Sequence, residues 1–373
     1  MRTERRTART ATSTAVVVAA LSAVAGHALG AVDFGSPEEI PKGDSSGSVA
    51  IGDFDRDGKN DIAATNPGTG SVAVLEGRGN GSFKDYVDYA TGSIPSSVAI
   101  GDFDRDGKPD LAVANASDDD VSILEGRGNG RFKPEEGFDV GDRPFFVAVG
   151  DFDRDRKPDL ATANHDDNTV SILEGRGNGR FKAAVDHDVG VNPRSIAVGR
   201  FDRGRTRDLA VADSGGINVS VLYGNGDATF GDAQEFLAGN NPLSLAAGDF
   251  DRDGRKDLAV VLCGKSDLVI LEGRANGTFK NPVTYQASTC PGHVEAADFD
   301  RDGILDLGVA NSTDMDVSVF EGRANGTFKN PIDFPAGGSP EAIAVGKLDR
   351  DRRRDIVVAP SNSTSLWLLR NEL

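Results

Sequence analysis

Aromatic residues, histidine and cysteine are scarce in this sequence. Of its 373 residues, 6% are aromatic, and there are one tryptophan, four histidines and two cysteines. Proteins that bind several sugars at once usually stack them on aromatic side chains, so the composition disfavours a multivalent lectin. The one tryptophan, Trp367, falls inside a predicted strand. Neither His187 nor His293 is accompanied by a nucleophile motif, so the sequence gives no recognisable catalytic set.

Long hydrophobic runs are absent after residue 30. Before it, the basic stretch MRTERRTAR precedes the apolar run TAVVVAALSAVAG, which is shorter than the roughly 20 residues that span a bilayer. Small residues follow at Ala28 and Gly30, which predicts a signal peptide over residues 1–30. A retained anchor is the alternative, and Arg5-Arg6 leaves a twin-arginine signal open. We expect residues 31–373 to be secreted, periplasmic or at the cell surface, without membrane insertion.

Basic residues are outnumbered by acidic ones. The chain has 41 Lys and Arg against 59 Asp and Glu, a formal charge of −18. Residues 1–30 carry four arginines and one glutamate, so their removal lowers the charge from −18 by 3, to −21. Such a surface repels nucleic acid and anionic lipid and favours bound cations. The two cysteines, Cys263 and Cys290, predict one disulfide in an exported protein, with two buried thiols as the alternative.

An internal repeat organises the whole chain. The stretch DFDRDGKPD, which begins at Asp102, recurs in related form every 49 residues. The seven copies begin at Asp53, Asp102, Asp151, Arg200, Asp249, Asp298 and Lys347. A second motif, LEGRGNGRF at Leu124, has six copies at the same interval. Residues 31–373 number 373 minus 30, or 343, which is seven times 49 and supports cleavage after Gly30.

Each repeat predicts four antiparallel strands. In the second repeat they cover residues 96–103, 110–116, 121–127 and 131–140. Gly128-Asn129-Gly130 forms a tight turn between the last two, because Asn-Gly accepts the positive φ of hairpin turns. Pro134 restricts the fourth strand to a sheet edge. After residue 30 no segment shows sustained helical periodicity, so the fold class is all-β.

Four strands per unit and seven units predict a seven-bladed β-propeller formed by residues 31–373 as a single domain. The phenylalanine of the second motif recurs from Phe83 to Phe328. One step of 49 before Phe83 lies Phe34, while one step after Phe328 lies beyond the chain end. The chain therefore starts with an extra fourth strand and ends without one. We predict that residues 31–42 complete the last blade and close the ring.

The motifs DFDRDGKPDLAV and LEGRGNGRF at this period resemble the FG-GAP or VCBS repeats of integrin α-subunit heads and of many secreted bacterial propellers. The resemblance covers essentially the whole of residues 31–373. It implies a propeller that uses one face for ligands, as integrin heads do.

The pattern D-x-D-x-D-G-x-x-D itself indicates a calcium loop. Calcium takes 6–8 oxygen ligands, which carboxylates at positions 1, 3, 5 and 9 and the carbonyl of position 7 can supply, whereas magnesium prefers a smaller shell with several waters. The four intact loops comprise Asp53, Asp55, Asp57, Lys59 and Asp61; Asp102, Asp104, Asp106, Lys108 and Asp110; Asp249, Asp251, Asp253, Arg255 and Asp257; and Asp298, Asp300, Asp302, Ile304 and Asp306.

Three loops depart from this pattern. The third repeat keeps Asp151, Asp153, Asp155, Lys157 and Asp159 but has Arg156 in place of the glycine at position 6, which predicts a weaker fifth site. The fourth has Arg200 and Gly204 at two ligand positions, and the seventh has Lys347 at position 1. There we predict internal cations instead of calcium. Lys347 would lie among Asp349, Asp351 and Asp355, and Arg200 beside Asp202 and Asp208.

Strand directions sort the connections onto two faces. The aspartate loops and the turns between strands 3 and 4 share one face, here called the aspartate face. The turns between strands 2 and 3 and the crossovers between repeats share the other, the variable face, which differs from repeat to repeat and is where binding is expected. The candidates there are Asp118, Asp119, Asp120, Phe145, Phe146, His165, Asp166, Asp167, His293 and Asp314. Solvated turn acids and packing between repeats are the alternative roles.

The sequence thus favours a secreted, calcium-stabilised, monomeric propeller that acts as a non-enzymatic binding or adhesion module for a protein or cell-surface partner. A carbohydrate-binding lectin is one alternative, with a glycan on the variable face. A polysaccharide lyase or hydrolase on the same fold is another. An enzyme would need acid and base residues that converge in the central mouth or on the variable face.

Overall fold

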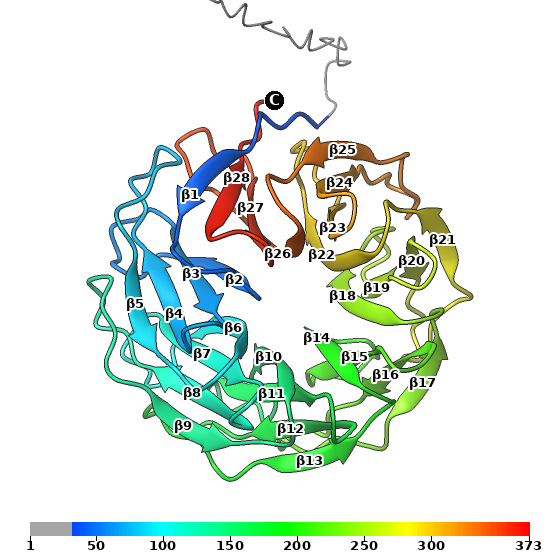
Figure 1. The fold of residues 1–373 in the computed structure, drawn as a ribbon. Helices are drawn as coiled ribbons and strands as arrows, with labels where there is room; N and C mark the ends of the chain where they lie inside the picture. Colours follow the sequence, from blue (N-terminus) through cyan, green and yellow to red (C-terminus); the bar gives the residue numbers. More distant parts are fainter. Residues whose placement is uncertain (1–31) are drawn as a thin grey trace, which may run out of the picture.

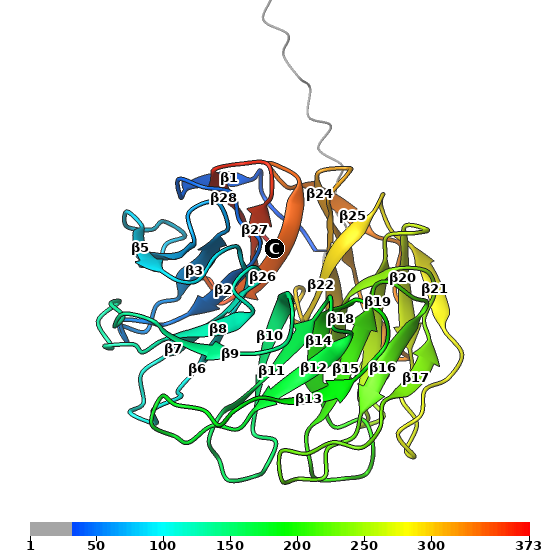
Figure 2. The same cartoon turned by 60° about the horizontal axis from the view of Figure 1, so that its bottom comes forward.

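The computed structural model describes residues 32–373, so the predicted signal peptide lies outside the described residues. These residues form 28 strands in seven four-stranded antiparallel sheets. The sheets stand around a central axis like blades (Figures 1 and 2). The prediction of an all-β, seven-bladed propeller is confirmed. Within residues 32–373 no helix is long and apolar enough to cross a membrane.

Blades 1 to 6 each contain four consecutive strands. Blade 1 contains β2 (Val49–Gly52), β3 (Asp61–Asn66), β4 (Ser71–Leu75) and β5 (Val87–Ala90). Blade 2 contains β6 (Pro95–Gly101), β7 (Asp110–Asn115), β8 (Asp120–Leu124) and β9 (Glu136–Asp139). Blade 3 contains β10 (Pro144–Gly150), β11 (Asp159–Asn164), β12 (Thr169–Leu173) and β13 (Val185–Asp188).

The other blades repeat this order. Blade 4 contains β14 (Pro193–Gly199), β15 (Asp208–Asp213), β16 (Asn218–Leu222) and β17 (Gln234–Leu237). Blade 5 contains β18 (Pro242–Gly248), β19 (Asp257–Leu262), β20 (Asp267–Leu271) and β21 (Val283–Gln286). Blade 6 contains β22 (Pro291–Ala297), β23 (Asp306–Asn311), β24 (Asp316–Phe320) and β25 (Ile332–Pro335). Blade 7 contains β26 (Pro340–Gly346), β27 (Asp355–Pro360), β28 (Ser365–Leu369) and β1 (Glu38–Pro41).

The fourth strand of each blade is shorter than the sequence predicts. In blade 2 it covers only Glu136–Asp139, and Pro134 lies before it. The third strand ends at Leu124, after which Gly126 and Phe132 form an isolated bridge. The fourth strand of blade 3 is equally short, although Ala183 and Ala184 precede it, so the short strand belongs to the repeat and does not depend on Pro134.

Blade 7 closes the ring with strands from both ends of the chain. Its order is β1-β28-β27-β26, with β1 antiparallel to β28 (Figure 1). Phe34 bridges Asn371 as Phe132 bridges Gly126 in blade 2. The Gly35 N–H also donates to the Arg370 carbonyl at 2.9 Å. The predicted closure by the N-terminal strand is confirmed.

Phenylalanine pairs join blades at six of the seven junctions, and Leu348 packs in one cluster with Phe83 at the junction of blades 7 and 1. Phe54 of blade 1 meets Phe132 of blade 2 edge to face, with ring centroids 5.6 Å apart. At the junction of blades 6 and 7, Phe299 meets Phe34 in the same way, with ring centroids 5.7 Å apart. The core therefore consists of seven similar clusters between blades, and Phe34 takes the place in blade 7 that Phe132 takes in blade 2.

A buried amide organises the variable end of several blades. Asn115 donates through Nδ2 to Asp120 Oδ1 at 2.6 Å and to Ser122 Oγ at 2.8 Å. Blade 4 has Asp213 at this position, 1% exposed, and its Oδ2 accepts from Ser220 Oγ at 2.8 Å. Its Oδ1 is buried without a hydrogen-bond partner. Burial raises the pKa of Asp213 to about 7.

The closure of the ring by the N-terminal segment is tested by Phe34→Ala, with Phe132→Ala as the matched control. The two side chains are 6% and 5% exposed, so each truncation should lower the free energy of unfolding by about 3–5 kcal/mol. Urea unfolding of residues 31–373 measures both. A near-zero effect of Phe34→Ala beside a large effect of Phe132→Ala would show that the ring is not closed by this strand.

Asp213→Asn tests the buried carboxyl. The folded pKa of about 7 exceeds the ordinary value of 3.8, so the folded state binds the proton more tightly than the unfolded state. The stability that this proton confers is present below pH 4 and is lost as the pH rises through 7. The variant should be more stable than wild type by about 2–4 kcal/mol at pH 8 and nearly equal at pH 4. A difference between the two proteins that stays constant with pH, measured by urea unfolding, would contradict this account.

Candidate metal centres and binding face

Each aspartate loop connects the first strand of a blade to the second. In blade 2 the loop leaves β6 at Gly101 and enters β7 at Asp110. Arg105 and Gly107 both adopt left-handed backbone conformations, with φ of 63° and 79°. In blade 3 Arg156 replaces the second of these and takes φ of 66°, as the sequence predicts. An arginine there carries a strain that glycine avoids.

Five loops bring carboxylates together. In each, three aspartates place one oxygen within 4.8 Å of the others. The clusters are Asp53, Asp55 and Asp57; Asp102, Asp104 and Asp110; Asp151, Asp153 and Asp159; Asp249, Asp251 and Asp257; and Asp298, Asp300 and Asp302. These are the five loops for which the sequence predicts a site. Position 9 joins the cluster in blades 2, 3 and 5, and position 5 replaces it in blades 1 and 6.

The loop oxygens fit a hard divalent cation. In blade 2 the N–H groups of Asp106 and Gly107 donate to Asp104 Oδ1 at 3.0 Å and to Asp102 Oδ2 at 3.1 Å, which fixes both carboxylates. The other oxygen of Asp102 is buried without a hydrogen-bond partner, as are the corresponding atoms of Asp249 and Asp298. Burial also raises the pKa of Asp104. A bound cation would satisfy the unpaired oxygen and relieve the repulsion.

The residue at position 7 contacts the carboxylate at position 5. Lys108 pairs with Asp106, and this hydrogen bond lowers the pKa of Asp106. Lys59, Lys157 and Arg255 pair with Asp57, Asp155 and Asp253 in the same way. Blade 6 has Ile304 at position 7 and therefore lacks this pair, and Asp302 joins its cluster. The predicted position-5 ligand is therefore shared with a cationic side chain in four loops.

The aspartate at position 9 has a second role that the sequence did not reveal. Asp110 is fully buried, and its two oxygens accept from the N–H groups of Phe103 and Gly126, each at 2.7 Å. Asp208, in the fourth loop, makes the same two contacts with Phe201 and Gly224. The carboxylate thus ties the aspartate loop to the 3–4 turn whether or not its loop can hold a cation. Burial raises the pKa of Asp110 to about 6.

The FG-GAP-like repeat family matches residues 53–113, 102–162, 151–203, 205–260 and 298–358. Together these segments cover well over half of the chain. The chain belongs to the FG-GAP-like repeat family. No curated protein sequence matches it.

Solved structures share the fold of this FG-GAP-like propeller at low identity. BBS1N, solved in complex with ARL6DN, is 16% identical with a TM-score of 0.63, covering 89% of this chain and 97% of its own. A catalytically inactive virginiamycin B lyase from Staphylococcus aureus, solved with quinupristin, is 11% identical with a TM-score of 0.62, covering 90% and 99%. An Agrocybe aegerita lectin that recognises terminal N-acetylglucosamine is 15% identical with a TM-score of 0.53, covering 78% and 80%.

The predicted internal cations of the two degenerate FG-GAP-like loops are wrong. Lys347 and Arg200 are both exposed, and neither forms an ion pair within residues 32–373. In the seventh loop Asp351 instead lies 3.5 Å from Arg353. Burying an ammonium or guanidinium group is costly, so a long side chain at position 1 stays hydrated at the surface.

Most acids on the variable face bind the protein's own backbone. Asp118, Asp167 and Asp314 accept from the N–H groups of Ser93, Asp142 and Thr289 in the neighbouring crossovers, at 2.7, 2.6 and 2.6 Å. Asp119 accepts from Arg143 N–H at 2.8 Å, and Asp120 from Asn115. These aspartates hold the crossovers in place, which agrees with the structural alternative for them.

A small set of other side chains surrounds the mouth of the central channel on this face. Arg194 of blade 4 and Glu341 of blade 7 meet across it at 2.8 Å. Phe145 lies beside His165, with ring centroids 4.9 Å apart, and beneath the guanidinium groups of Arg143 and Arg194 at 5.1 and 5.5 Å from its ring. The sequence singled out Phe145 and His165 but missed the three charged residues.

The channel wall carries two further groups below the mouth. The predicted candidate His293 is enclosed in the ring, and burial lowers its pKa to about 4. Glu295 stands where the other six blades carry alanine, and burial raises its pKa to about 7. The predicted candidates Phe146 and Asp166 play smaller parts, since Phe146 packs against the core cluster between blades 3 and 4 and Asp166 contacts His165 at 2.6 Å.

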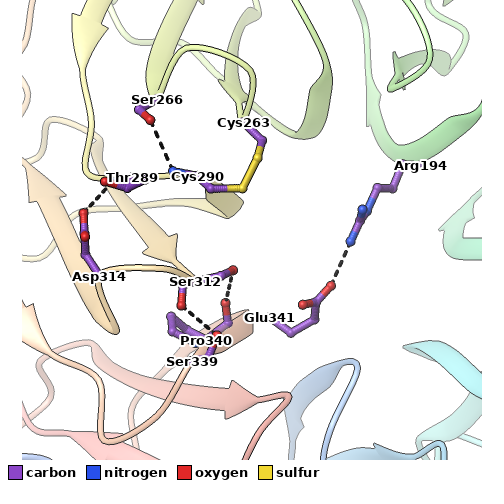
Figure 3. Close-up of a disulfide and its surroundings, with 10 residues drawn as sticks. All are labelled: Arg194, Cys263, Ser266, Thr289, Cys290, Ser312, Asp314, Ser339, Pro340 and Glu341. Carbon is purple, nitrogen blue, oxygen red and sulfur yellow. Dashed lines mark hydrogen bonds and ion pairs between the residues drawn. A yellow bond between two sulfur atoms is a disulfide. The ribbon is translucent and has the colours of Figure 1, made fainter.

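The predicted disulfide is confirmed. Cys263 follows β19, Cys290 precedes β22, and their Cα atoms are 4.1 Å apart. Cys290 N–H also donates to Ser266 Oγ at 3.3 Å. Figure 3 shows this disulfide on the same face as the Arg194–Glu341 pair. It joins the 2–3 turn of blade 5 to the start of blade 6.

The two roles of the position-9 aspartate are separated by Asp110→Asn and Asp208→Asn. Each leaves one buried N–H without an acceptor and should lower the free energy of unfolding by about 1–3 kcal/mol without divalent cations. In millimolar calcium the loss should grow for Asp110→Asn alone, because Asp208 belongs to no carboxylate cluster. Urea unfolding with calcium and with a chelator measures both. Equal losses for the two variants under both conditions would exclude Asp110 as a cation ligand.

Proposed function

We propose that residues 31–373 form an exported, calcium-stabilised, non-enzymatic binding module whose partner is a protein that docks on the variable face. The export follows from the predicted signal peptide and the predicted disulfide, and extracellular fluid supplies calcium. Calcium suits loops of four carboxylates and a carbonyl better than magnesium does. The module acts as a monomer.

The distribution of exposed apolar side chains carries the proposal. Eight large hydrophobic residues are exposed in residues 32–373. Four lie on the variable face, namely Ile94, Val191, Ile217 and Met315. The other four lie on or beside outer strands, namely Tyr86, Val185, Leu237 and Val283. None lies on the aspartate face. Apolar side chains that ring a polar, aromatic-containing mouth are typical of protein-docking surfaces.

Among the exposed apolar residues of the variable face, Val191 and Ile217 belong to the same blade. Val191 is 53% exposed in the crossover that enters blade 4, and Ile217 is 46% exposed in the 2–3 turn of the same blade. Gly215 N–H donates to the Val191 carbonyl at 2.9 Å, so the two segments are held together. Phe145 and Arg143 of blade 3 extend the surface to the mouth with the aromatic and arginine side chains that dominate binding energies.

The double variant Val191→Ser, Ile217→Ser should bind the partner at least tenfold more weakly, while its free energy of unfolding stays nearly unchanged. Val185→Ser with Val283→Ser is the matched control, because these residues are 55% and 43% exposed on outer strands. The assay measures retention of purified extracellular proteins on immobilised residues 31–373 in millimolar calcium. Equal retention by both double variants would place the partner elsewhere.

The same immobilised chain should be offered a polysaccharide panel, with retention and released reducing or unsaturated ends both measured. Retention without products would favour a lectin and overturn the protein partner. Product release that disappears in Glu341→Gln or His165→Asn would establish a lyase or hydrolase at the mouth. The proposal expects neither retention nor products.

A further inference from the structure

A hollow on the aspartate face is lined almost entirely by arginine. It lies at the junction of blades 3 and 4, has a volume of about 350 Å³, and is lined by Arg154, Arg156, Arg200, Arg205, Arg207 and Asp151. These five arginines are here called the arginine groove. All five are exposed. The feature lies opposite the proposed docking face, so it is independent of the proposed function.

The groove arises where the repeat loses its acidic character. In blade 4 the loop reads RFDRGRTRD, which places Arg200 where five of the other six loops begin with aspartate. In blade 3 Arg156 replaces the glycine at position 6. Arg154 extends toward blade 4, since its Cδ lies 3.3 Å from the point that a Cβ on Gly226 would occupy, in the 3–4 turn of that blade. The arginine side chains of two neighbouring loops therefore line the same hollow.

None of the five guanidinium groups forms an ion pair with the described part of the chain. Across residues 32–373, fifteen close ion pairs form, and none includes a groove arginine. The only carboxylate that lines the groove is Asp151. The five guanidinium groups repel one another, and an anion bound between them would relieve this repulsion. The groove is also a local reversal of charge, because the chain as a whole carries a net charge of −18.

The chemistry of the groove defines its ligand. Guanidinium groups bind sulfate and phosphate through paired N–H donors, and five of them exceed what one oxyanion needs. The adjoining loops of blades 2 and 5 are acidic and would repel a long polyanion. We propose that the arginine groove binds a compact polyanion that carries two or more sulfate or phosphate groups.

Asp151 links the groove to the cation cluster of blade 3. It belongs to the group formed with Asp153 and Asp159 and also lines the groove. A cation held by these carboxylates would neutralise the only negative charge in the groove. Polyanion binding should therefore be tighter in millimolar calcium than in a chelator, and calcium binding should tighten by the same factor when the polyanion is present.

The test titrates residues 31–373 with sucrose octasulfate, and with sucrose as the uncharged control, by isothermal calorimetry in millimolar calcium. Binding should occur for the sulfated sugar alone and weaken with added salt. The groove variant carries Arg156→Gln, Arg205→Gln and Arg207→Gln. It should bind about tenfold more weakly or worse, since charge-assisted bonds are lost.

The control variant carries Arg127→Gln, Arg131→Gln and Arg203→Gln, which removes the same charge from exposed positions of the aspartate face outside the groove. It should bind like wild type. No binding of sucrose octasulfate, or equal losses in both triple variants at unchanged thermal stability, would overturn the proposal. Titration with inositol hexakisphosphate in calcium-free buffer distinguishes a phosphate-preferring groove from a sulfate-preferring one, and either preference supports it.

Discussion

Closure of the ring is the constraint on which the rest of this structure depends. Each blade buries its two faces against its neighbours, so an open array would leave two apolar faces in water. The chain avoids this because β1 pairs with β28 and Phe34 packs on Phe299. Only blade 7 combines strands from both ends of the chain, because the other six blades each consist of four consecutive strands.

The aspartate loops show how one repeated motif can serve folding and binding separately. The carboxylate at position 9 accepts two backbone N–H groups in all seven blades, including blade 7, where Asp355 contacts Leu348 and Asn371. Positions 1 and 5 can change, since Arg200 and Gly204 replace these two aspartates in blade 4. Their loss in blade 4 leaves the blade intact and replaces a candidate cation site with the arginine groove.

The sequence was sufficient for the fold and for the clustering of the loop carboxylates, since both depend on residues that recur at a fixed interval. Lys347 and Arg200 were placed wrongly because sequence spacing says nothing about the cost of burying a cation. Arg194 and Glu341 were missed because they are 147 residues apart and meet only when the ring is closed. Their one signal was the residue after each repeated proline, such as Pro193 and Pro340, where the side-chain type changes from blade to blade.

The most direct test is a crystal structure of residues 31–373 grown in millimolar calcium, with an anomalous difference map at a wavelength where calcium scatters. The account predicts peaks in the five loops that begin at Asp53, Asp102, Asp151, Asp249 and Asp298, with the weakest in the loop that contains Arg156. It predicts no peak in the loops that begin at Arg200 and Lys347. An absence of peaks, or peaks in all seven loops, would contradict it.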